Sequence, residues 1–291
     1  MQARTPFRTV TGAALAATLV AVLVAGCAHA PAGRAGGGWG AAPVVTDSTV
    51  ALYRFDESTG LVLTDTAPAH RDGIYGLDAH VEFGRFRGAR RFTGTINSFA
   101  LVAADRAPAL GPSWTMQVWV RPTAIGLVEC NVIAARWTEQ PEEQGWMLGM
   151  LGANRPTVPD APPIPDVFTA ALPRHEAGLV VFAFQPREAG APRAFTSTTR
   201  LELDRWQQVT VTYDGATLSL YLDGRLDAQY TDPAGIRDVA TPLVFGNLID
   251  PRWLTDSLGA TRVPDDGSHW PFYAWVGLLD EFSLTEGVAR P

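Results

Sequence analysis

The sequence contains no lysine, so all 23 of its basic residues are arginines, and 30 acidic residues outnumber them. The formal net charge is −7 at pH 7, and the arginines are not gathered in a basic cluster. An acidic surface repels the phosphate backbone of a nucleic acid. The composition therefore argues against nucleic-acid binding.

Cysteine is almost absent, with Cys27 near the N-terminus and Cys130 in the middle of the chain. If Cys27 carries a lipid, as argued below, only one thiol remains and an intrachain disulfide is excluded. Cys130 lies in the apolar run of residues 127–135, which favours a buried, inert thiol over a nucleophile.

Motifs of common catalytic centres are also missing. The five histidines form neither a His-Glu-x-x-His motif nor a close pair, and no Gly-x-Ser-x-Gly motif occurs. These absences argue against a zinc hydrolase and an α/β serine hydrolase. The glycines of residues 33–40 follow no strand and precede no helix, so a dinucleotide-binding loop is excluded.

The N-terminus has the pattern of a secretory signal. Arg4 and Arg8 precede an uncharged apolar run over residues 9–24, which ends in Val24-Ala25-Gly26-Cys27. This tetrad resembles the bacterial lipoprotein signal, which implies cleavage after residue 26 and lipidation of Cys27. The alternative is an uncleaved transmembrane helix, but the run is short for a span of ~30 Å and no stop-transfer charge follows.

Lipidation predicts a protein attached to a membrane surface in an extracytoplasmic space of a bacterial cell envelope. Ala28 stands where an inner-membrane retention signal would have Asp, which favours the outer membrane in a Gram-negative cell. Residues 27–46, rich in Ala, Gly and Pro, are predicted to be a flexible tether before one domain over residues 47–291.

Residues 206–230 indicate the fold most clearly. Val209, Val211 and Tyr213 alternate with polar residues, which is the period of a strand with one buried face. Asp214-Gly215 and Asp223-Gly224 provide two turns between alternating runs. This pattern predicts an antiparallel meander of three strands.

Further short strands are predicted on both sides of the meander, and no helical periodicity follows the signal peptide. They cover residues 50–55, 81–83, 89–92, 99–103, 113–121, 128–137, 145–151, 178–184, 243–245 and 274–284. Many short strands with regular turns predict an all-β, two-sheet antiparallel sandwich or jelly roll.

The order of several motifs over residues 48–285 resembles the laminin-G-like, concanavalin A-like lectin/glucanase jelly roll. The matching pieces are Leu52-Tyr53-Arg54-Phe55-Asp56-Glu57, residues 88–94, residues 113–122 ending in Trp-Val-x-Pro, residues 206–224, and Gly277-Leu278-Leu279-Asp280-Glu281-Phe282. The resemblance implies that the first and last strands lie side by side. Two long insertions, residues 153–175 and 250–272, depart from it.

The resemblance to glucanases raises the question of catalysis. Those enzymes use a Glu-x-Asp-x-x-Glu strand, and retaining hydrolysis needs two carboxyl groups ~5 Å apart. Here Glu202 and Asp204 are followed by Gln207, which cannot ionise. We therefore assign no catalytic residue and expect these two acids to be solvated.

The resemblance also implies a structural calcium ion near the acid of the closing strand. Carried over by position, Asp280 is the main carboxylate, Asp56 or Glu57 reaches it from the first strand, and Asp65 is a weaker ligand. The alternative is that these acids cap turns or pair with Arg54 and Arg90.

Carbohydrate binding needs an aromatic plane with polar groups around it. Trp253, Trp270 and Tyr273, together with Asn247, are the predicted ligand-binding residues, because they lie in or beside the polar insertion. The alternative is that they pack in the core, as we expect for Trp114 and Trp146.

These features predict a non-catalytic extracytoplasmic module that recognises a glycan or a cell-surface protein and holds calcium as its one ion. The alternatives are a glycan hydrolase with a noncanonical acid pair and a structural component of an envelope complex. Proteins with this fold perform all three roles, so only the residues of the functional site can show which role this chain has.

Overall fold

The computed structural model describes residues 40–126, 130–138, 140–153, 172, 174–250, 252 and 273–289. They belong to one compact unit, Gly36–Pro291. Three predicted residues, Cys27, Trp253 and Trp270, lie outside the described ranges.

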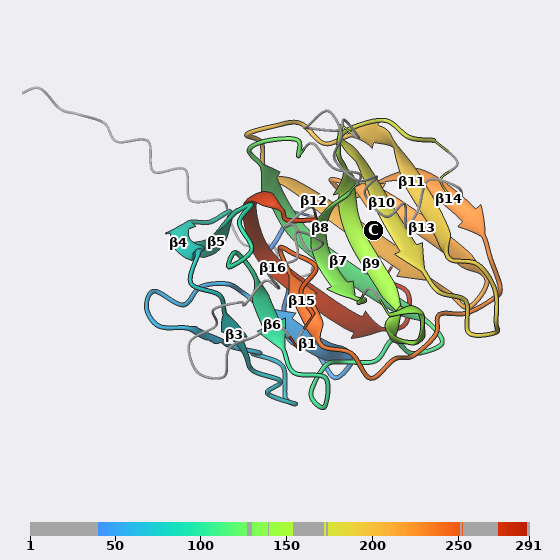
Figure 1. Ribbon diagram of the computed structural model, residues 1–291, viewed down its shortest axis with the longest axis horizontal. Coiled ribbons are helices and arrows are strands. Elements are labelled where there is room, and N and C mark those ends of the chain that lie inside the picture. The colour runs from blue at the N-terminus through green and yellow to red at the C-terminus, as the bar shows by residue number, and fades with distance from the viewer. Residues whose placement is uncertain are drawn as a thin grey trace, which may run out of the picture. The chain divides into compact units, whose positions relative to one another are not determined.

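Two antiparallel sheets form the domain (Figure 1). Sheet A runs in the order β14 (Arg225–Thr231), β13 (Thr217–Leu222), β12 (Gln207–Tyr213), β7 (Trp114–Pro122), β16 (Val276–Glu286), β5 (Gly88–Thr93) and β4 (Ala79–Phe83), with β1 (Thr49–Tyr53) also paired to β16. Sheet B runs in the order β11 (Arg193–Arg200), β10 (Leu179–Phe184), β9 (Trp146–Leu151), β8 (Cys130–Arg136), β15 (Leu243–Phe245), β6 (Ala100–Val102), β3 (Gly73–Tyr75) and β2 (Val62–Leu63).

The predicted all-β jelly roll is confirmed. Pro141–Glu143 form a 3₁₀ turn, and none of the described residues form a helix with the length and apolarity that crossing a membrane requires. The predicted meander is confirmed as β12, β13 and β14 in antiparallel succession. At its turns Gly215, Asp223 and Gly224 adopt positive φ of +97°, +48° and +77°.

The first and last strands are neighbours, as the resemblance implied. Tyr53 of β1 lies opposite Phe282 of β16. The ring of Phe245, from β15 of sheet B, lies 5.2 Å from the ring of Tyr53 and 4.8 Å from that of Phe282, centroid to centroid. This aromatic contact ties the two chain ends of sheet A to sheet B.

Alternation along β7 shows how the sequence divides the two sides of sheet A. Trp114, Met116, Val118 and Val120 belong to the core between the sheets, as predicted. The intervening residues face away from the core. Trp146 of sheet B also lies in this core, so the expectation for both Trp114 and Trp146 is confirmed.

Three strands, β2, β3 and β11, are absent from the predicted ranges, and β11 is the longest of them. β11 carries Thr196, Ser197, Thr198 and Thr199 in succession, and its burial follows no simple alternation. Because β11 is the terminal strand of its sheet, part of it faces solvent on several sides and the apolar signal is weak.

Candidate functional site

The outer side of sheet A, facing away from the core, carries polar residues in adjacent register positions. Gln208 pairs with Trp119, Thr210 pairs with Gln117 and Tyr221, and Thr212 pairs with Thr115 and Ser219. Ser219 in turn pairs with Gln229 of β14. We call this surface, over β7, β12, β13 and β14, the polar face. It arises because successive residues of a strand point to opposite faces of the sheet, so that residues at every second position of these strands face outward.

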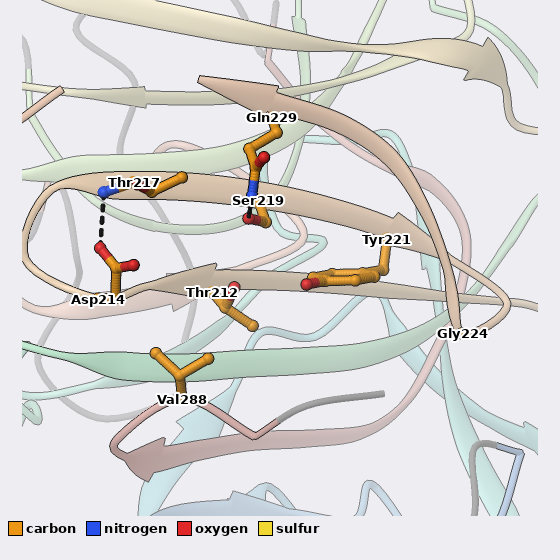
Figure 2. A pocket seen from close by; sticks show the side chains of 8 residues that line it. All are labelled: Thr212, Asp214, Thr217, Ser219, Tyr221, Gly224, Gln229 and Val288. Carbon is orange, nitrogen blue, oxygen red and sulfur yellow. Dashed lines mark hydrogen bonds between the residues drawn. The ribbon is translucent and has the colours of Figure 1, made fainter. Parts of the chain in front are cut away.

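A hollow of about 690 Å³ lies along β13 on the polar face, from Asp214 in the turn before this strand to Gly224 in the turn after it. Its lining consists of Thr212, Asp214, Thr217, Ser219, Tyr221, Gly224, Gln229 and Val288. Figure 2 shows Thr212, Ser219 and Tyr221 on the same side of their strands, and the amide of Gln229 donates to Ser219 Oγ at 3.0 Å. Hydroxyl and amide groups at this density suit a ligand that both donates and accepts hydrogen bonds.

A second hollow, of about 250 Å³, lies over Trp119 and Gln208 of the same face. It is lined by Gly40, Arg85, Trp119, Arg205, Trp206, Gln208 and Asp223. The indole of Trp206 is half-buried, whereas Trp119 is only 5% exposed. The second hollow therefore combines an accessible aromatic ring with charged and amide groups.

Several buried polar atoms of sheet A lack a hydrogen-bond partner among the described residues. Gln208 Oε1, Thr210 Oγ1 and Trp119 Nε1 lie on the polar face, and Asp280 Oδ1 lies opposite Trp119 in the register. Buried polar atoms in proteins almost always have a partner. Their concentration here indicates that water, an ion or a ligand completes this surface.

The loop between β4 and β5 covers Trp119. The Arg85 guanidinium lies 4.9 Å from the Trp119 ring centroid, and the Phe86 ring meets Trp119 edge-on at 5.8 Å. Asp280 Oδ2 holds this loop, because it accepts the backbone N–H of Arg85 at 2.7 Å and of Phe86 at 3.2 Å. A Cβ at Gly84 would lie 2.6 Å from this same oxygen, so the approach requires glycine.

Burial raises the pKa of Asp280 to about 7, and the two N–H groups of the loop only partly oppose this effect. The neighbouring acids Glu281 and Asp56 also raise it. The pKa of Glu281 is raised by burial as well, while the guanidinium of Arg54, 2.7 Å away, favours its charged form. Asp280 is thus a buried carboxyl with one oxygen available for a further interaction.

The other predicted calcium ligands have partners of their own. Both carboxylate oxygens of Glu57 accept hydrogen bonds, from the N–H of Thr64 and the hydroxyl of Tyr75. Asp65 accepts three backbone N–H groups, which makes it a turn-capping residue. Asp56 Oδ1 accepts the N–H of Gly88.

Of the predicted set, Asp280 and Asp56 therefore fit a cation best, since Asp280 keeps an oxygen without a partner and Asp56 acts on it electrostatically. No group of three His, Cys, Asp or Glu side chains that could hold a metal occurs in the part of the chain that the structure describes. Backbone carbonyl oxygens would have to complete the coordination.

The remaining predicted site residues do not meet in one place. Asn247 is buried and donates to the carbonyl of Thr95 at 3.1 Å, and Tyr273 packs in a cluster beneath sheet B with Met147. Trp253 and Trp270 lie outside the described residues. The predicted binding role of the 250–272 insertion therefore stays a prediction.

The incomplete glucanase motif forms a turn rather than a carboxylate pair. Glu202 and Asp204 are exposed and form ion pairs with Arg205 and Arg121, respectively. Gln207 Oε1 accepts the N–H of Glu202. The two acids lie at the surface, as expected.

Sequence reasoning did not select the polar face, although part of its signal was available. Trp119 stands between Gln117 and Arg121 on the outward side of an alternating strand. A large aromatic residue on such a side is a candidate for ligand contact. Arg85 and Phe86 carried no comparable signal, because their contact with Trp119 spans more than thirty residues of sequence.

Residues 176–288 match the family model Laminin_G_3, described as the concanavalin A-like lectin/glucanases superfamily. The match covers the strands from β10 to β16. No curated protein sequence matches the chain. The predicted resemblance to the concanavalin A-like lectin/glucanase family is thus confirmed for the part of the chain that contains the meander and the closing strand.

Solved structures share the fold across most of the chain. The binding domain of Paraclostridial Mosquitocidal Protein 1 is 12% identical, with a TM-score of 0.55 over 84% of this chain and 50% of its own. The receptor binding domain of botulinum neurotoxin type G is 11% identical, with a TM-score of 0.52 over 84% of this chain and 49% of its own.

Domain 4 of AbnA, a GH43 extracellular arabinanase from Geobacillus stearothermophilus solved with arabinotriose, is 14% identical. Its TM-score is 0.52 over 82% of this chain and 93% of its own. This chain spans about half the length of the two toxin domains and nearly all of the arabinanase domain. Identities this low show a shared fold and no more.

Proposed function

Because the chain carries a concanavalin A-like jelly roll, we propose that it is a non-catalytic binding module whose polar face recognises a carbohydrate. The observation that carries this proposal is the convergence of buried polar atoms without partners and two hollows on one side of sheet A. A saccharide supplies hydroxyl groups that can donate and accept hydrogen bonds, and it presents apolar ring faces to aromatic side chains.

Two observations support this proposal. The structural neighbours include the binding domain of a mosquitocidal protein, the receptor binding domain of a botulinum neurotoxin and an arabinanase domain solved with arabinotriose. Within this chain, the ring of Trp206 lines the second hollow together with the amide of Gln208. An aromatic surface bordered by a few polar groups is the usual composition of a small-ligand site.

Replacing Trp206 with alanine should weaken saccharide binding about thirtyfold. An aromatic side chain that a ligand covers on binding contributes about 2 kcal/mol, and each 1.4 kcal/mol corresponds to a factor of ten. A glycan array would first identify the saccharide, and calorimetric titration would give the affinities. The control is Val62→Ala, which removes an exposed apolar group from sheet B. Equal affinity of the Trp206 variant and wild type would contradict the proposal.

The hydrolase alternative makes a different demand. It requires two carboxyl groups that converge on one saccharide bond, one as acid and one as nucleophile or base. Among the described residues, Glu202 and Asp204 are engaged with arginines at the surface, which favours binding without catalysis. Release of reducing sugar from a bound oligosaccharide by the purified chain would overturn this part of the proposal.

We further propose that Cys27 carries the lipid that attaches the protein to a bacterial envelope membrane. The support is the signal pattern that ends at Val24-Ala25-Gly26-Cys27. Cys27→Ser should move the protein from the membrane fraction to the soluble extracytoplasmic fraction, because the variant has no thiol at residue 27 to which the lipid could be attached. Immunoblotting of both fractions measures this result. Retention of the variant in the membrane would favour the uncleaved helix.

A structural calcium ion at Asp280, with Asp56 beside it, completes the proposal. When bound, the cation would supply positive charge to a buried carboxylate, so that the carboxylate stays ionised at neutral pH. Asp280 would then hold both the ion and the loop of Arg85 and Phe86 above the second hollow.

A further inference from the structure

An exposed arginine stands at the second hollow without an acidic partner. The guanidinium of Arg85 forms no ion pair or side-chain hydrogen bond with any described residue, although the chain has an excess of acidic side chains. The neighbouring arginines differ, because Arg205 pairs with Glu202 and Asp223, and Arg121 pairs with Asp204. Of the arginines bordering this hollow, Arg85 alone has no acidic partner in the described ranges.

Arg85 is also held in place. Its backbone N–H is fixed by Asp280 at 2.7 Å, and its guanidinium lies over the indole of Trp119. This cation–π contact involves no hydrogen bond, so the N–H groups of the guanidinium can still form a bidentate contact with a carboxylate. A side chain restrained before binding also loses less conformational entropy when the ligand arrives.

The acids near Arg85 do not compete for this contact. Asp223, which lines the same hollow, accepts the N–H of Gln208 with one oxygen and the guanidinium of Arg205 with the other. Asp280 is turned to the loop backbone and lies beyond ion-pair distance of the Arg85 guanidinium. Among the described residues that line the hollow, the Arg85 guanidinium is therefore the cationic group that can donate hydrogen bonds to a carboxylate of a ligand.

We propose that the saccharide carries a carboxylate, as a uronic acid does, and that Arg85 binds this group while Trp206 contacts the sugar ring. This inference rests on the function proposed above and specifies its ligand class. Charged hydrogen bonds are stronger than neutral ones, so the carboxylate should determine which saccharides the site selects.

The test compares short oligomers of galacturonate and of glucuronate with their methyl esters, which keep the ring and lose the charge. Calorimetric titration of wild type should show that at least one acid form binds about tenfold to a hundredfold more tightly than its ester. Arg85→Gln should bring the ratio of the two affinities close to one, because it weakens binding of the acid far more than binding of the ester. Arg87→Gln, which removes the same charge from the same loop but leaves the guanidinium over Trp119 in place, should keep the preference.

The outcomes separate this inference from the proposed function. Equal binding of acid and ester by wild type, or binding of neutral saccharides alone, overturns the carboxylate assignment and leaves carbohydrate binding intact. Loss of the preference in Arg87→Gln as large as in Arg85→Gln also overturns it, because the effect would then be general electrostatics. Failure to bind any saccharide contradicts both proposals.

Discussion

Replacing Phe245 with alanine should lower the free energy of unfolding by about 3–5 kcal/mol, which is the usual cost of removing a fully buried phenylalanine ring. The Phe245 ring contacts the rings of Tyr53, Phe55 and Phe282, with centroids 4.8–5.4 Å away. Its loss opens a cavity where the first strand, the last strand and sheet B meet. Urea unfolding followed by circular dichroism measures the effect.

Phe83→Ala is the matched control, since the same atoms are removed from a side chain that is 94% exposed. Its expected effect lies within about 0.5 kcal/mol of zero. If Phe245→Ala does not fold, Phe245→Leu should still show a loss below about 1.5 kcal/mol. Similar losses for Phe245→Ala and Phe83→Ala would mean that the closure between the two sheets does not depend on this aromatic contact.

Asp280 should make the calcium-free protein less stable as the pH rises from about 4 to about 7. Burial raises the pKa of the folded-state carboxyl from 3.8 to about 7, so within this range the folded chain keeps a proton that the unfolded chain releases. Stability then falls with rising pH by up to about 1.4 kcal/mol per pH unit, or about 4 kcal/mol in all.

The Asp280→Asn variant isolates this contribution, because its amide cannot ionise and its oxygen can still accept the N–H groups of Arg85 and Phe86. The difference in unfolding free energy between variant and wild type should grow in favour of the variant from pH 4 to pH 7 in the presence of a chelator. A constant difference across this range would show that Asp280 ionises normally in the folded protein.

Calcium should reverse this penalty in the wild type. A cation that binds only the folded chain adds RT ln(1 + [L]/Kd), which is about 2.7 kcal/mol at a concentration one hundred times Kd. The melting temperature at pH 7.5 should therefore rise when calcium replaces the chelator, and Asp280→Asn should not respond. An unchanged melting curve for wild type would count against an ion at Asp280.

Local patterns determined much of the fold. The alternation of Val209, Val211 and Tyr213 and the turn at Asp223-Gly224 predicted strands and reversals that the structure confirms. These signals lie within a few residues of each other, because strand period and turn conformation depend on near neighbours. That the first and last strands are neighbours followed only from the family resemblance, since no local pattern connects residues so far apart, and the register of Tyr53 opposite Phe282 came from the structure.

The position of the candidate site depended on tertiary structure. Asp280 holds the loop of Arg85 and Phe86 across nearly two hundred residues of sequence, and this loop covers Trp119 of a third segment. The sequence by itself determined that strands alternate polar and apolar residues and close into two sheets. Only the folded chain decided which outward residues lie together and which acids, such as Asp65 and Glu57, are already occupied by hydrogen bonds. The physical reason is that a binding surface is formed by contacts between distant segments, whereas the burial pattern of a strand follows from the order of residues within that strand.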